Sequence, residues 1–296
     1  MKVVLAGGSG FIGRRLTAAL AGAGHHVAVL SRRSGAGSVR TIVWDGRTQG
    51  PWAEEVRTAD AVVNLAGESI AARRWTRTQK ELLRSSRLDP TRALVRAMTS
   101  RTTPGTLVST SAVGYYGDVP DGVVTEEHPP GTGFLADLSV EWESAAREAE
   151  SSGTRVVLPR IGVVLDRNGG ALERMVPFFR SYLGGPLGSG RQWFPWVHLD
   201  DVVGAILFAL ATPALAGPAN LTAPHPVSMK VFAASLGRAL GRPSWAPVPP
   251  FALRLLLGEM AGMLLGGQRA VPAALLRHGY TFRHPELDPA LASALS

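Results

Sequence analysis

Three glycines spaced three residues apart, Gly7, Gly10 and Gly13, are the first residues whose pattern suggests chemistry. They follow a short apolar run and open a helical pattern. The first glycine permits a tight turn, the second lets the backbone approach a phosphate, and the third lets the helix pack closely on the strand. The free N–H groups at the start of such a helix attract anions. The pattern predicts a dinucleotide-binding loop, with cofactor contacts at Gly7, Ser9, Gly10, Phe11, Ile12 and Gly13.

The second apolar run, residues 27–30, ends in Ser31, Arg32 and Arg33. A site for NAD usually carries an acid here to accept from the ribose 2′-hydroxyl, whereas Arg32 would pair with a 2′-phosphate. Asp45 comes too late to be that acid and is more typical of a loop or a helix cap. The alternative for Arg32 is a solvated surface arginine. We predict NADP(H) as the cofactor.

Continuous apolar runs alternate with helical patterns through the first two thirds of the chain. The runs predict strands at residues 3–6, 27–30, 61–65, 106–110 and 155–158, and the periodic stretches predict helices at 13–23, 79–99 and 138–151. Strands buried on both faces are typical of a parallel sheet covered by helices. We predict an α/β fold: a Rossmann-type, doubly wound parallel sheet with a smaller C-terminal substrate or cap region.

Three parts are expected along the chain. Residues 1–165 form the NADP-binding Rossmann domain, with a sheet contribution from later residues. Residues 166–240, where glycine and proline become frequent, form a substrate-side region, and residues 241–296 form a helical C-terminal segment. We expect the later parts over the carboxyl edge of the sheet, where open α/β folds bind ligands.

Composition limits the class of protein. The chain has 296 residues and no cysteine, which excludes disulfides and thiolate sites and fits a cytoplasmic protein. The net charge of +8 comes from scattered residues, mostly arginines, so we expect no nucleic-acid partner. Residues 251–265 are the most apolar stretch, but they include charges and fall short of the roughly 20 apolar residues of a membrane span. We predict a buried or docking helix there, and no membrane partner.

His198, Asp200 and Asp201 form the one cluster that invites a metal interpretation. They supply too few ligands for a closed site, and no second motif completes the set. We expect Asp200 or Asp201 to cap a helix that begins near Val202, and we predict no metal.

Several motifs, taken together, resemble those of extended short-chain dehydrogenases/reductases. More closely, the chain resembles the atypical epimerase-family branch that carries the C-terminal domain DUF1731. The matching stretches occur in order over nearly the whole chain, at residues 7–13, 64–68, 74–76, 86–87, 111–118, 160–165, 184–188, 196–198 and 266–269.

The resemblance implies NADP(H) binding through residues after the second and fourth strands and on the following helix, namely Ser31, Arg32, Leu65, Ala66, Glu81 and Arg87. Gly67 belongs to the same small turn as Ala66, which lets backbone approach the adenosine. Glu81 and Arg87 lie six residues apart on one predicted helix, a spacing that allows them to be near neighbours. The alternative for both is an exposed helix charge.

Short-chain dehydrogenases usually work through a serine or threonine, a tyrosine, and a lysine four residues after the tyrosine. The tyrosine serves as acid or base, the lysine lowers its pKa, and the serine orients the substrate. Ser111 follows a predicted strand, where the family's serine belongs. The tyrosine and lysine positions hold Phe134 and Leu138, which can neither transfer a proton nor stabilise a phenolate. Lys80 and Lys230 do not lie at a spacing that would replace the lysine.

Substitute acids and bases are available. Tyr115 and Tyr116 follow Ser111 on the same loop, and these three residues are our candidates for catalysis. The alternative for the tyrosines is aromatic packing against the nicotinamide or the sheet. Asp137 and Glu141 lie four apart and share a helix face, where a solvated surface is the simpler interpretation.

The second half of the chain is expected to supply the substrate side. Arg160 ends a predicted strand and is placed next to the nicotinamide as a further cofactor contact. Residues 184–191, with Trp193 and Phe194, form a loop that could close on a ligand, with Arg191 facing an anion.

Two functions remain open at this point. The first is an NADP(H)-dependent oxidoreductase or epimerase-like enzyme acting on a small polar substrate. The second is a catalytically weak or inactive NADP(H)-sensing protein, which the absence of Tyr-x-x-x-Lys favours. A serine hydrolase is excluded because the chain has no Gly-x-Ser-x-Gly elbow. The expected partner is a small molecule, with a homodimer as an option.

Overall fold

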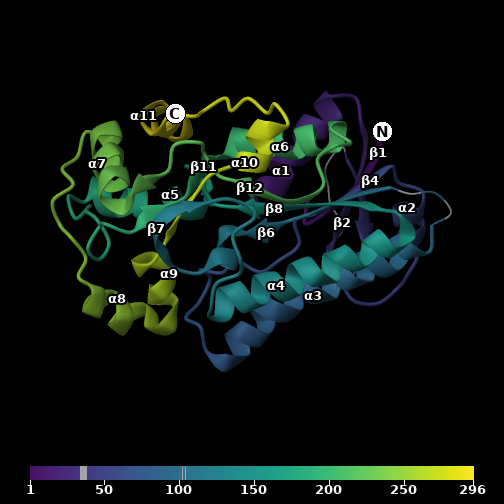
Figure 1. Ribbon diagram of the computed structural model, residues 1–296, viewed down its shortest axis with the longest axis horizontal. Coiled ribbons are helices and arrows are strands. Elements are labelled where there is room, and N and C mark those ends of the chain that lie inside the picture. The colour runs from purple at the N-terminus through teal and green to yellow at the C-terminus, as the bar shows by residue number, and fades with distance from the viewer. Residues whose placement is uncertain (34–38, 102, 104) are drawn as a thin grey trace.

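A parallel sheet forms the centre of the computed structural model, which describes residues 1–33, 39–101, 103 and 105–296 (Figure 1). The strand order is β12-β8-β5-β4-β1-β2-β3, and β6 also pairs with β8. The strands are β1 (Lys2–Ala6), β2 (His26–Ser31), β3 (Arg40–Val43), β4 (Ala61–Asn64), β5 (Thr106–Ser109), β6 (Ser111–Ala112), β8 (Arg155–Ile161) and β12 (Gly217–Leu221). Strand order reverses between β1 and β4, so the ligand crevice is expected there.

Helices cover both faces of this sheet (Figure 1). On one face Val3 and Leu5 pack against α1 (Phe11–Gly22) and α6 (Leu199–Ala211). On the other face Val4 and Ala6 pack with residues of α2 (Trp52–Arg57), α3 (Arg77–Thr99) and α4 (Phe134–Arg147). Alternate residues of one strand thus enter two separate cores, which is why the strand is apolar throughout. The predicted Rossmann-type fold is confirmed.

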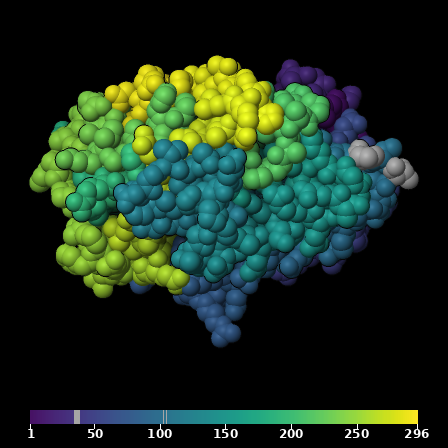
Figure 2. Space-filling model, in the orientation of Figure 1, coloured from purple at the N-terminus to yellow at the C-terminus, as the bar shows by residue number. Residues whose placement is uncertain are grey.

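A smaller lobe lies beyond the carboxyl edge of the sheet. Its core joins α5 (Gly170–Arg180), α7 (Met229–Leu240) and α11 (Leu287–Leu295), and Figure 2 shows green and yellow residues of the later chain at the left and top of the view. The lobe's other elements are short: β9 (Val163–Asp166), β10 (Trp193–Phe194), β11 (Trp196–His198), β13 (Val227–Ser228), α8 (Pro250–Leu257), η3 (Gly258–Ala261) and α9 (Gly262–Leu265). α10 (Ala273–Arg277) packs instead on β12, in the core of the central sheet. β14 (Gln268–Ala270) pairs with β7 (Val119–Val124), and the remaining elements are η1 (Val113–Tyr116) and η2 (Glu148–Ser152).

Several elements of the Rossmann part were not predicted, among them β3, β12 and α2. β3 alternates between exposed and half-buried residues and so lacks an apolar run. β12 begins with Gly217 and Pro218, which are typical of a turn, and α2 is only six residues long. Each becomes regular because a neighbouring element pairs with it or covers it, and no local pattern records that.

Two expectations about later helices were wrong or incomplete. The helix expected near Val202 begins at Leu199, and its N-cap is His198, whose side chain accepts a hydrogen bond from the N–H of Asp200. Neither aspartate caps it. The apolar stretch 251–265 folds as two short helices joined by η3, and α8 exposes Phe251. No helix in the described part of the chain has both the length and the apolar character required to cross a membrane.

We expect Gly13→Ala to destabilise the protein by about 1–3 kcal/mol, because the added methyl group would overpack the turn. The new Cβ would collide with the carbonyl oxygen of Gly7 and lie 2.7 Å from the Cα of Gly8. Gly22→Ala, on the same helix, is the matched control, because a Cβ there meets nothing within 4 Å. Urea unfolding of both variants measures the difference. Equal stability of the two would contradict the packing argument.

Candidate functional site

The glycine loop lies at the carboxyl end of β1, against the turn that follows β4. Gly7 has a positive φ of 79°, and a Cβ there would lie 2.8 Å from the backbone of Leu65. Gly10 is the N-cap of α1 and donates its own N–H to the carbonyl of Gly7 at 3.0 Å. The first N–H groups of α1 therefore have no side-chain cap, which leaves them available to an anion.

A surface pocket of about 630 Å³ lies beside the end of β2. Arg32, Trp44, Asp45 and Trp52 are among its lining residues. The Asp45 carboxylate accepts hydrogen bonds from Thr48 and from the N–H groups of the next turn, which lowers its pKa to about 2. Asp45 is thus a loop residue, as predicted, and Arg32 is the exposed cation of the pocket. Residues 34–38 lie outside the described part of the chain.

Arg87 lies on α3 beneath the turn at Gly67, and its side chain is only 7% exposed. Its guanidinium donates to the carbonyl oxygens of Leu83 and Glu68, at 3.1 and 2.9 Å. No ion pair with a carboxylate is present within the residues described. Burial lowers the pKa of Arg87 to about 10, against an opposing effect of the Glu68 charge. Arg87 is therefore a largely desolvated cation, hydrogen-bonded to backbone carbonyls but in no salt bridge with a carboxylate of the described residues.

Glu81 does not lie beside Arg87, so the expected proximity of the two was wrong. Glu81 is exposed and pairs with Arg77, one turn earlier, at 3.2 Å. Six residues on an α-helix correspond to about 600° of rotation, which leaves the two side chains about 120° apart. Arg87 therefore faces the sheet edge and Glu81 faces the surface.

A buried polar network joins the predicted Ser111, Tyr116 and Arg160. Arg160 makes two hydrogen bonds of 2.8 Å with Glu143, and Ser111 donates to the same carboxylate at 2.7 Å. Arg160 also donates to the Tyr116 hydroxyl at 2.9 Å, and that hydroxyl donates to Asn220 at 2.6 Å. Burial alone would lower the pKa of Arg160, but the hydrogen bonds and charge of Glu143 raise it above the ordinary value. Arg160 is therefore a cation.

The two adjacent tyrosines differ in what they can do. Tyr116 is fully buried, and burial raises the pKa of its hydroxyl to about 12. Its hydroxyl is already engaged with Arg160 and Asn220. Tyr115 is half-buried, and its ring lies on the Arg160 guanidinium, 3.5 Å from ring centroid to guanidinium carbon. The structure leaves Tyr115 as the more accessible phenol.

The positions of the absent Tyr-x-x-x-Lys pair are at the start of α4. Phe134 packs edge-on against Trp75, and Leu138 is buried. Lys80 of α3 places its ammonium 5.2 Å from the centre of the Phe134 ring and pairs with Glu259. The sequence offered no lysine at a suitable spacing, yet the fold brings one to this position from another helix.

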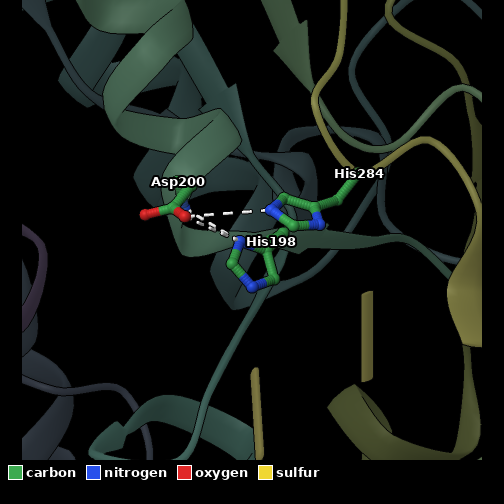
Figure 3. A group of neighbouring side chains, drawn as sticks. All are labelled: His198, Asp200 and His284. Atoms are coloured by element: carbon green, nitrogen blue, oxygen red, sulfur yellow. Dashed lines mark hydrogen bonds and ion pairs between the residues drawn. The ribbon is translucent and has the colours of Figure 1, made fainter. Parts of the chain in front are cut away.

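His198, Asp200 and His284 meet at the start of α6 (Figure 3). The two imidazole rings stack at 3.8 Å, and Nδ1 of His198 and Nε2 of His284 lie 4.0 and 3.8 Å from Asp200 Oδ2. Arg15 also pairs with Asp200 at 3.0 Å, and His198 Nδ1 already accepts the N–H of Asp200. Burial and the nearby His284 lower the pKa of His198. The Asp200 carboxylate is thus paired with Arg15, and Nδ1 of His198 is already hydrogen-bonded. The cluster connects the start of α6 to the C-terminal loop that carries His284.

Sequence reasoning missed Glu143, Asn220, Lys80 and His284 as members of these groups. Glu143 carried a usable signal, because an acid in the middle of a buried helix face requires a partner. The others had none, because their partners are distant in the sequence.

Comparisons with known proteins agree with this geometry. Residues 3–221 match the model of the NAD dependent epimerase/dehydratase family, and residues 248–294 match the domain of unknown function DUF1731. The resemblance predicted from the motifs is confirmed. Epimerase family protein Mb2239 of Mycobacterium bovis is 47% identical over 294 residues, covering 99% of this chain and 97% of the relative.

Two solved structures are also similar. The human epimerase family protein SDR39U1 (isoform 2), crystallised with NADPH, is 39% identical, with a TM-score of 0.91 and coverage of 99% of both chains. A nucleoside-diphosphate sugar epimerase of Corynebacterium glutamicum is 33% identical with a TM-score of 0.82. That match covers 100% of this chain and 58% of the other.

We expect Glu143→Gln to lower the free energy of unfolding by about 3–5 kcal/mol, because it leaves Arg160 buried without its counter-ion. Glu141→Gln, two residues earlier on α4, is the control. Glu141 pairs with Arg84 at 2.7 Å where both side chains are more than a third exposed, so its loss costs less than about 1 kcal/mol. Chemical denaturation at pH 7 measures both. A Glu143 variant no less stable than the Glu141 variant would disprove the role of the buried pair.

Proposed function

Because the chain belongs to the NAD-dependent epimerase/dehydratase family, we propose that it is an NADP(H)-dependent oxidoreductase or epimerase-like enzyme acting on a small polar substrate. The observation that carries the proposal is Arg87, a buried cation without a carboxylate partner, beside Gly67 at the edge that holds the glycine loop. A buried unpaired charge is costly, and the phosphates of a dinucleotide would supply its counter-charge. The NADPH in the human relative supports this choice.

Arg32 selects the phosphorylated form of the cofactor in this proposal. It is exposed at the end of β2, in a pocket whose only carboxylate among the lining residues, Asp45, is already engaged by its own turn. A 2′-phosphate there would meet a guanidinium that no carboxylate of the described residues engages. The backbone of Leu65 and Ala66 would border the adenosine side, and the loop residues Ser9, Phe11 and Ile12 would present their N–H groups to the diphosphate.

When bound, NADP(H) supplies hydride chemistry to a carbonyl or alcohol group. Tyr115 is our candidate to exchange the matching proton, because its hydroxyl is the more accessible of the two phenols and its ring lies on the Arg160 cation. In reduction its O–H would donate a proton to the carbonyl oxygen of the substrate. Ser111 and Tyr116 would hold Arg160 in place through the buried network.

A second function is favoured by one specific observation. Phe134 and Leu138 occupy the positions of the proton-transferring pair, and neither can do acid–base chemistry. A protein that binds NADP(H) and senses it without turnover would have this combination of features. The sensor and the enzyme would have the same cofactor site, so measurements of cofactor binding alone do not distinguish these two functions.

The cellular setting and the partners are further parts of the proposal. The absence of cysteine supports a cytoplasmic location, which we retain as a proposal. A small-molecule substrate is proposed on the precedent of the Corynebacterium glutamicum relative, which is described as a nucleoside-diphosphate sugar epimerase. A homodimer is the alternative to a monomer, and light scattering of the purified protein distinguishes the two.

Arg32→Gln should weaken NADPH binding by about 10- to 100-fold, the effect of losing one charge-assisted hydrogen bond. NADH binding should change little, since NADH lacks the 2′-phosphate. Fluorescence titration of both cofactors measures this, with Arg254→Gln on α8 as a control for the loss of one positive charge. Equal affinity of the parent protein for NADPH and NADH would refute the role given to Arg32.

Tyr115→Phe should reduce turnover by about 100- to 10,000-fold while NADPH binding is kept, as expected for loss of a proton donor. Tyr116→Phe is the matched control, and it should chiefly lower stability, by about 1–3 kcal/mol, because it leaves Asn220 and Arg160 short of a partner. The assay is NADPH oxidation with a panel of aldehydes, ketones and nucleotide sugars. Tight NADPH binding without turnover of any substrate would instead support the sensor.

A further inference from the structure

We propose that Lys80 and Glu259 form a second cofactor-binding unit, in which the Lys80 ammonium binds oxygen atoms on the nicotinamide half of NADP(H). The inference rests on the proposed function. In this proposal Lys80 of α3 supplies the positive charge that the family's lysine would provide at the position of Leu138 on α4. The pair with Glu259 also gives the C-terminal segment, the part matched as a domain of unknown function, a part in cofactor binding.

The position of the ammonium is the first argument. Lys80 Nζ lies 5.2 Å from the centre of the Phe134 ring, at the start of α4. That is the end of α4 where the family's tyrosine and lysine are normally found. Only 29% of the Lys80 side chain is exposed, so this side chain lies along the protein surface and does not extend into solvent.

The second argument is that Lys80 and Arg87 share a face of α3. Seven residues correspond to about 700° of rotation, so the two side chains point within about 20° of each other and are separated by about 10.5 Å along the helix. Arg87 contacts Gly67 at the sheet edge. If the phosphates of a dinucleotide lie at Arg87, its two halves extend in opposite directions from that point. The nicotinamide half then lies either toward Lys80 or toward Arg32. Arg32 already defines the adenosine end in the proposed site.

The third argument concerns what holds the ammonium in place. Glu259 of η3 accepts a hydrogen bond of 2.6 Å from Lys80 Nζ. An ammonium has three N–H donors, so this bond leaves donors for ribose hydroxyls or a phosphate oxygen. An ammonium with a single fixed partner has less rotational freedom to lose on binding, which favours binding. The pair also ties the C-terminal segment to α3 across this side of the molecule.

The chain has only three lysines, Lys2, Lys80 and Lys230, so lysine chemistry can report on this one site. Lys2 pairs with Glu55 at the amino end of the sheet, and Lys230 is exposed at the start of α7. The first experiment acetylates the intact parent protein and reads each lysine by peptide mass spectrometry. It is run without ligand, with NADPH, and with 2′,5′-ADP, which carries the adenosine 2′-phosphate and lacks the nicotinamide half.

NADPH should slow acetylation of Lys80 severalfold, whereas saturating 2′,5′-ADP should leave it unchanged. Lys230 should react equally in all three conditions and serves as the internal reference. This measurement uses the parent protein and does not depend on any variant folding. Unchanged acetylation of Lys80 in the presence of bound NADPH would overturn the inference, as would equal protection by both ligands.

The second experiment measures binding to Lys80→Met, Lys80→Arg and the control Lys230→Met. Lys80→Met should weaken NADPH about tenfold, equivalent to about 1.4 kcal/mol, and leave 2′,5′-ADP affinity unchanged. Lys80→Arg should recover part of the loss because it keeps the positive charge. An equal loss for both ligands, or no loss, contradicts the assignment. If the parent protein itself binds no NADPH, the proposed function fails instead, so the two failures are distinguishable.

Discussion

The ion pair between Arg160 and Glu143 is the interaction on which the centre of this site depends. Both side chains are buried, and the pair persists because each charge is neutralised and further hydrogen-bonded. Arg160 holds the Tyr116 hydroxyl, which holds Asn220 of β12, while its flat face carries the Tyr115 ring. One cation at the end of β8 therefore connects the strand, the helix α4 and the tyrosine loop. Arg160, which the sequence suggested as a cofactor contact, here has a structural environment complete within the protein.

Arg87 has the opposite character. It is also buried, but its guanidinium donates to backbone carbonyls and forms no ion pair with a carboxylate of the described residues, and the first turn of α1 has no side-chain cap. A buried cation without a carboxylate partner is costly, and an anion at this edge would stabilise it. The molecule thus holds two buried arginines of different kinds: Arg160 pairs with a carboxylate, whereas Arg87 bonds to neutral groups among the described residues.

Several polar contacts connect the C-terminal segment to the carboxyl edge of the sheet. Glu259 pairs with Lys80, and the N–H of Gly267 donates to Asp118 at 2.9 Å. Gln268 reaches the carbonyl of Val113, next to the tyrosine loop. The segment thus touches both α3 and the loop that bears Tyr115. The same segment also packs α10 against β12 and α11 against α7, so it covers the sheet edge and completes the smaller lobe as well.

The amino-acid sequence alone was enough to predict the Rossmann-type fold, the glycine loop and the absence of the Tyr-x-x-x-Lys pair. These features are local, because a buried parallel strand must be apolar throughout, a tight turn needs glycine, and a missing side chain is visible without any structure. The bounds of the predicted helices and strands were also close, whereas the two edge strands β3 and β12 and the short helix α2 were not predicted, because neighbouring elements order them.

Which of these residues act together depends on the tertiary structure. Glu81 was placed near Arg87 by counting along a helix, but rotation about the helix axis separates them. Lys80 was dismissed on spacing, yet packing of α3 against α4 brings it to Phe134. Tyr115 and Tyr116 are indistinguishable in sequence, and burial alone makes one a structural hydroxyl and leaves the other accessible. Spacing along the chain fixes only neighbours within an element, whereas the environment of a side chain depends on which distant elements surround it.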